Sequence, residues 1–77
     1  MSEVFRIEGF RFFFYSNDHR PIHIHVRYGG GEAVFVVEDR VELRESQGLK
    51  ALELRRAREL AEEHKNLIVR KWNECLD

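Results

Sequence analysis

The sequence is short of the residues on which disulfide-rich and thiolate-metal domains depend. Its 77 residues include one cysteine, Cys75, so the chain can form no intrachain disulfide and no zinc site built from several thiolates. This usage fits a reducing compartment. An excess of charge is also missing, because 13 Lys and Arg nearly balance 14 Asp and Glu. Binding to nucleic acid or anionic lipid would therefore need a local basic patch.

Long apolar runs are absent as well. No segment approaches the length that crosses a bilayer, and the start MSEVFRIEG lacks the pattern of a secretory signal. We therefore expect a cytoplasmic protein with no membrane partner. The length suffices for one compact core, so we expect residues 1–77 to form a single domain.

The first half of the chain alternates as β-strands do. VFRI at 4–7 and FRFFFYS at 10–16 flank Glu8-Gly9, a pair suited to a tight hairpin turn. A polar loop closed by the only proline leads into IHIHVRY at 22–28, which alternates strictly and puts both histidines on one face. This segment is predicted to be a third strand with a histidine face.

Further strands follow the glycine run at 29–31, which permits a chain reversal. EAVFVVE at 32–38 is continuously apolar, as in a strand buried on both sides, and VEL at 41–43 suits a short edge strand. We therefore predict four to five strands within residues 3–44.

The period changes from Leu49 onward to steps of three and four residues, which indicates one amphipathic helix. Its apolar stripe consists of Leu54, Ala57, Ala61, His64, Ile68, Trp72 and Cys75. We predict a single helix over about 50–76, with a kink near 64–66 as an alternative, and a frayed start because Lys50 is a poor cap.

Together these segments predict an α+β fold, an antiparallel β-meander followed by one long C-terminal helix packed on one face. One helix covers one face only. The other face would present Phe13, Tyr15, His23, His25, Arg27 and either Val34 with Val36 or Ala33 with Phe35. An exposed apolar patch of this kind marks a protein contact, so we expect a homodimer or a small partner protein.

The histidines are the candidate functional residues. His23 and His25 project from one strand face roughly 6.6 Å apart, so two imidazoles can converge on one ion. A third ligand would come from His19 or from Asp18 in the preceding loop. Such a set suits a divalent metal such as zinc, nickel or iron.

The same residues also suit metal-free catalysis. His23 or His25 would act as general acid or base with Asp18 as partner, and Arg27 or Arg20 would stabilise a phosphorane-like transition state, as in a small ribonuclease. The simplest alternative is structural: the histidines form the polar face of a half-buried strand, and Asp18 and His19 belong to a turn.

The stretches RFFFYSNDHRPIHIHV, GGGEA, VEL, ESQGL and WNE, in this order, resemble a bacterial family known as domain of unknown function 4160. The resemblance implies a small component of a toxin–antitoxin-like pair that binds a partner protein, with RNA as a further candidate partner. Similar sequences usually have proline where Ile22 stands and serine where Lys50 stands, which implies a looser loop and a weaker helix start here. They vary at His19 and often have Asn at the position of His64, which argues against these two as essential ligands.

Three hypotheses of different kinds therefore stand after the sequence. The chain is a component of a toxin–antitoxin-like pair, a His-based hydrolase or metal-binding domain centred on His23 and His25, or a purely structural interaction domain. The hydrolase and the structural hypotheses differ in the expected stability of a variant that lacks both histidines. Removing surface catalytic residues leaves stability nearly intact, whereas removing structural residues lowers it.

Overall fold

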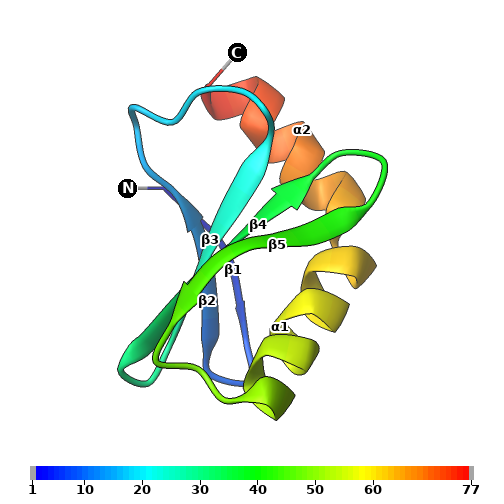
Figure 1. Cartoon of the computed structure of the whole chain (residues 1–77). Coiled ribbons are helices and arrows are strands. Elements are labelled where there is room, and N and C mark those ends of the chain that lie inside the picture. Colours follow the sequence, from blue (N-terminus) through cyan, green and yellow to red (C-terminus); the bar gives the residue numbers. More distant parts are fainter. Residues whose placement is uncertain (1, 77) are drawn as a thin grey trace.

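The computed structural model describes residues 2–76. Five antiparallel strands form one sheet in the order β1-β2-β3-β4-β5, and two helices follow (Figure 1). The elements are β1 (Ser2–Ile7), β2 (Phe10–Phe14), β3 (His23–Tyr28), β4 (Gly31–Val37), β5 (Val41–Gln47), α1 (Ala51–Glu63) and α2 (Lys65–Cys75). The predicted α+β meander is confirmed. Within 2–76, no helix combines the length and apolar character that a membrane span needs.

The strands extend beyond the predicted 3–44 at both ends. The largest difference is at β5, where the prediction of a short strand over 41–43 is wrong, because pairing with β4 continues to Gln47. β5 is an edge strand whose residues 42–47 are all exposed. Beyond Leu43 its sequence therefore carries none of the apolar alternation by which a strand is recognised.

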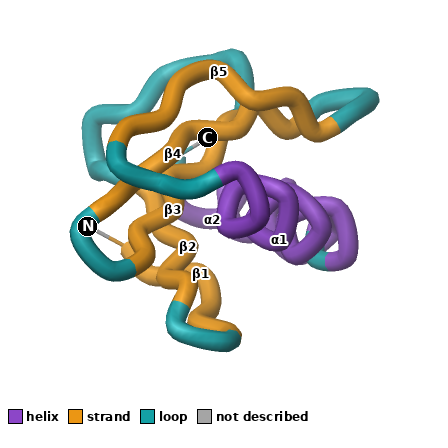
Figure 2. Tube along the Cα trace, turned by 60° about the horizontal axis from the view of Figure 1, so that its bottom comes forward, coloured by secondary structure: helices purple, strands orange, loops and turns teal. Residues whose placement is uncertain are grey.

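The prediction of one continuous helix is wrong, and the alternative of a break near 64–66 is the one that the structure has. The helix ends at Glu63, His64 takes a non-helical backbone with φ −111° and ψ 22°, and α2 begins at Lys65. An unbroken helix over 50–76 would be about 40 Å long, whereas the longest dimension of the molecule is 32 Å. The break therefore keeps both helices on one side of the sheet (Figure 2).

The core lies between the helices and one face of the sheet. Buried sheet residues include Phe12, Phe14, Ile24, Val26, Phe35 and Val37, and buried helix residues are Ala57, Leu60, Ala61, Ile68 and Trp72. The predicted helix stripe is thus largely confirmed. It fails at Cys75, which is exposed near the end of α2.

The opposite face carries Phe13, His25 and Val34 side by side on β2, β3 and β4. The register therefore selects Val34 with Val36, not Ala33 with Phe35. Phe13 is only 1% exposed and Val34 only 9%, so the expected exposed apolar patch is wrong.

Neighbouring side chains of the same face cover Phe13. The ring of Tyr15 meets it edge-on, and the guanidinium groups of Arg11 and Arg27 lie 5.8 and 5.6 Å from its centre. Cation–π contacts of this kind let polar residues shield an aromatic ring. The apolar surplus from which we predicted a homodimer is therefore not present on this face.

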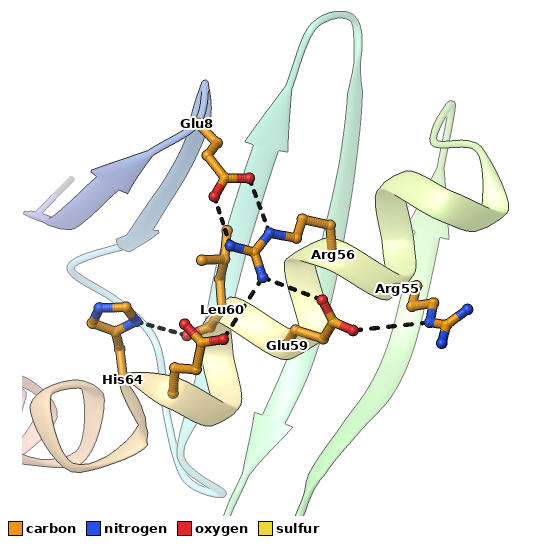
Figure 3. A network of polar contacts seen from close by, with 7 residues as sticks. Glu8, Arg55, Arg56, Glu59, Leu60 and His64 are labelled. Carbon is orange, nitrogen blue, oxygen red and sulfur yellow. Dashed lines mark hydrogen bonds and ion pairs between the residues drawn. The ribbon is translucent and has the colours of Figure 1, made fainter.

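A network of ion pairs joins the β1–β2 turn to α1 (Figure 3). Arg56 donates to both carboxylate oxygens of Glu8, at 2.6 and 2.9 Å, and to Glu59 at 3.2 Å. These hydrogen bonds lower the pKa of Glu8. The network is exposed, and we assign it the structural role of holding the hairpin against the helix.

The start of α1 has half of a capping box. The Lys50 N–H donates to Glu53 Oε1 at 2.8 Å, but the Lys50 ammonium has no acceptor atom to offer the first helical N–H groups. Its extended backbone, φ −76° and ψ 161°, is that of a normal N-cap.

We expect Lys50→Ser to raise the free energy of unfolding by about 1 kcal/mol in urea denaturation. Lys50→Ala is the control, and equal stabilisation by alanine would contradict this explanation.

Candidate functional site

Asp18, His23 and His25 form a compact cluster where the β2–β3 loop folds back onto the start of β3. His23 Nε2 lies 3.2 Å from Asp18 Oδ1, and His25 Nε2 lies 3.1 Å from Asp18 Oδ2. One ligand atom from each of the three residues lies within 4.8 Å of the other two. The loop thus closes over both histidines of the strand.

A local turn fixes the position of Asp18. Its carboxylate accepts the Tyr15 N–H at 2.8 Å, and its own N–H donates to the Tyr15 carbonyl at 3.1 Å. Aspartate often bonds nearby backbone in this way. The Asp18 side chain therefore both forms the predicted turn and contacts the two histidines.

A backbone carbonyl orients His23. Its Nδ1 lies 2.8 Å from the carbonyl oxygen of Pro21. A carbonyl oxygen can only accept, so Nδ1 carries the hydrogen. Nε2 is the atom that remains to face Asp18.

Aromatic rings surround the two imidazoles. The Phe13 ring lies nearly parallel to His25 at 5.5 Å, and Tyr15 meets His25 edge-on at 4.6 Å. From α2, the ring of Trp72 lies 5.2 Å from that of His23. The side chains of His23, His25 and Asp18 are consequently only 8%, 18% and 10% exposed. The cluster is held rigidly and is largely shielded from water.

The environment keeps Asp18 ionised. Burial raises the pKa of its carboxyl group, but the hydrogen bond from the Tyr15 N–H and the contacts with His25 and His23 outweigh this. The net result is a pKa below the usual 3.8. Asp18 therefore offers carboxylate oxygens at neutral pH.

This shift predicts a dependence of stability on pH. A carboxyl group with a lowered folded-state pKa stabilises the fold above its unfolded-state pKa, and this contribution is lost as the pH falls through the folded-state value. We expect Asp18→Asn to be less stable than the native chain at pH 6 and the difference to shrink below about pH 4. Denaturation at several pH values measures this, and a constant difference down to pH 2 would contradict it.

The predicted site residues fall into two groups. Asp18, His23 and His25 come together, whereas His19 is exposed and is not a member of the cluster. Arg27 lies on the same sheet face but pairs with Glu32 at 3.3 Å and covers Phe13. The structure therefore brings Asp18, and not His19, to the two histidines.

Sequence reasoning missed the residues that support the cluster, namely Tyr15, Pro21 and Trp72. The first two act through backbone groups, which the sequence does not display. Trp72 was assigned to the core, where it lies at 1% exposure, but its contact with His23 joins residues far apart in the chain. No local pattern signals such a contact.

A groove adjoins the cluster on the same face. It has a volume of about 310 Å³, and its lining includes Tyr15, His25, Glu32, Val34, Glu45 and Gln47. His25 thus contacts Asp18 on one side and borders the groove on the other.

Comparison with known proteins supports the resemblance noted in the sequence. No curated protein and no solved structure matches the chain. The family described as Domain of unknown function (DUF4160) matches residues 9–73, a span that includes the whole cluster. The chain therefore belongs to this family of domains of unknown function.

Proposed function

We propose that this protein binds a divalent metal ion of the zinc type through Asp18, His23 and His25. Two imidazoles and one carboxylate form a donor set that zinc accepts in proteins. The three ligand atoms converge within 4.8 Å of one another. A rigid, shielded setting favours binding because the ligands need little reordering.

The spacing of the atoms supports this proposal. Zinc–ligand distances of 2.0–2.1 Å in a tetrahedral site separate neighbouring ligand atoms by about 3.3 Å. Asp18 Oδ1 lies 3.2 Å from both His23 Nε2 and His25 Nε2. One carboxylate oxygen is thus already close to the tetrahedral separation from each imidazole nitrogen.

The contact between His23 Nδ1 and the Pro21 carbonyl oxygen is the observation that carries the proposal. Since Nδ1 donates to the Pro21 carbonyl, a neutral His23 turns the Nε2 lone pair toward the Asp18 carboxylate at 3.2 Å. Either a proton on Nε2 or a metal ion between the two atoms makes this contact attractive. Metal-binding histidines commonly donate the other ring N–H to a backbone carbonyl in this way. A bound metal would hold the two atoms together without a charged imidazole.

Catalysis by such a centre is a second step of the proposal. Three protein ligands leave a coordination position open, as in zinc enzymes. A metal there would polarise a substrate oxygen or activate a water molecule for hydrolysis. The groove favours this candidate, because one of the three proposed ligands, His25, lines it.

A role in a toxin–antitoxin-like pair is a further candidate, supported by the resemblance of the chain. In this role the domain would act in the bacterial cytoplasm by binding a second small protein or a second copy of itself, with RNA as another partner. Metal binding is compatible with this role, since a metal site can serve either member of such a pair.

The single tryptophan provides a direct test of metal binding. Trp72 lies 5.2 Å from His23, so a paramagnetic ion such as Co²⁺ bound at the cluster should quench its fluorescence strongly. We expect saturable quenching at one equivalent, reversed by excess Zn²⁺. His23→Gln should abolish it. His19→Gln, in the β2–β3 loop next to Asp18 but outside the cluster, is the matched control and should leave the quenching unchanged.

Two results would refute the proposal. One is the absence of saturable quenching in the native chain. The other is equal quenching in His23→Gln and His19→Gln. A native chain without metal, together with unfolding of the His23→Gln, His25→Gln double variant, would instead favour the purely structural interaction domain.

A further inference from the structure

The groove beside His25 is lined in part by apolar and aromatic side chains. Its lining includes Val34, which is 9% exposed, and Tyr15, one of the most exposed large hydrophobic residues of the described chain at 37%. An apolar side chain together with an accessible aromatic ring suits a flat or elongated side chain. A volume of about 310 Å³ is at the lower end for small-molecule sites, so it fits one large side chain.

The polar lining of the groove is acidic. Glu32 and Glu45 both line it. Glu32 is paired with Arg27 at 3.3 Å, whereas Glu45, on the exposed edge strand β5, makes no ion pair within residues 2–76. The groove therefore offers one carboxylate that no cationic side chain of residues 2–76 pairs with.

We propose that this groove binds an arginine side chain of a polypeptide partner. A guanidinium group stacks on aromatic rings and forms paired hydrogen bonds with carboxylates, which matches Tyr15 and Glu45. Its aliphatic stem would lie along Val34. Lysine lacks the planar group and binds more weakly. The proposal makes the partner a basic peptide and not RNA.

The inference deepens the proposed function by naming the chemistry of the partner. It rests on the metal site only in that the groove and the cluster share His25. A metal ion at the cluster would neutralise Asp18 but would leave Glu45 free to bind the guanidinium. Arginine binding is therefore expected both with and without zinc. This independence allows the two proposals to fail separately.

The test is an NMR titration of the full isotope-labelled chain with three probes, namely acetyl-Gly-Arg-Gly-amide, acetyl-Gly-Glu-Gly-amide and the ribodinucleotide UpU. We expect only the arginine peptide to shift the amide signals of the groove residues. Glu45→Gln should weaken its binding at least 10-fold, and Tyr15→Leu should weaken it as well. Glu62→Gln is the matched control, because Glu62 lies on the far side of the molecule in α1 and pairs with Arg58.

Equal binding of the two peptides, tighter binding of UpU, or an unchanged affinity in Glu45→Gln would overturn the inference. The titration is repeated with one equivalent of Zn²⁺. Arginine binding without any zinc binding would refute the metal proposal alone. Zinc binding without a response to the arginine peptide would refute the groove proposal alone.

Discussion

Asp18→Asn should lower the affinity of the chain for Zn²⁺ by at least about 100-fold. The substitution keeps the shape of the side chain and an oxygen that can accept the Tyr15 N–H. It removes the negative charge that lies 3.2 and 3.1 Å from the two imidazole nitrogens. Competition with a chromophoric chelator measures the affinity.

The control for this variant is Asp39→Asn, which removes one carboxylate from the exposed connection between β4 and β5. It changes the net charge equally but leaves the cluster intact. If both variants lowered zinc affinity to the same degree, the effect would be one of overall charge. The assignment of Asp18 as a ligand would then be wrong.

Gly31→Ala should destabilise the fold by about 3 kcal/mol. A Cβ atom at Gly31 would collide with the carbonyl group of Gly48 and would lie 2.8 Å from Leu49 Cδ2. The first of these neighbours is backbone, so it cannot turn aside as a side chain would. The close approach joins the start of β4 to the residues that lead from β5 into α1, and a shift there would disturb both.

Gly30→Ala is the matched control in the same glycine run. No atom lies within 4 Å of a Cβ built at Gly30, and its φ is not in the left-handed region. We expect its stability to stay within about 0.5 kcal/mol of the native chain. Urea denaturation measures both variants. A similar loss in the two would show that chain stiffness, and not the contact with Gly48, is responsible.

The sequence predicted the parts of the fold in which the spacing of apolar residues matches their burial. β3 alternates strictly, so its histidine face and its core face were both evident from residues 22–28. The Glu8-Gly9 turn and the apolar stripe through Ala57, Ile68 and Trp72 were equally readable. In the strand and in the helices, one face is apolar and the other is polar.

The failures arose where neighbours in space decide the outcome. Phe13 was predicted to be exposed because the helices cover only one face of the sheet, yet Tyr15 and two arginines shield it. The break at His64 was predicted only as an alternative, because no proline or glycine marks it in the sequence. There the imidazole Nδ1 bonds the Leu60 carbonyl at 2.9 Å and the ring stacks on Phe5 at 4.6 Å.

The candidate site was predictable in part for the same reason. His23 and His25 share a strand face by spacing alone. Asp18 and His19 were equally good third partners, because a loop without regular structure does not fix directions. The turn between Tyr15 and Asp18 decides in favour of Asp18, and it depends on backbone hydrogen bonds that the sequence does not show.

The most direct test of the central claim is native mass spectrometry of the chain purified without a histidine tag and supplied with one equivalent of Zn²⁺. The spectrum reports the bound metal and the oligomeric state together. Our account predicts one zinc ion per chain, retained in His19→Gln and lost in the variant that combines His23→Gln with His25→Gln. A metal-free native chain, or zinc retained by that double variant, would contradict it.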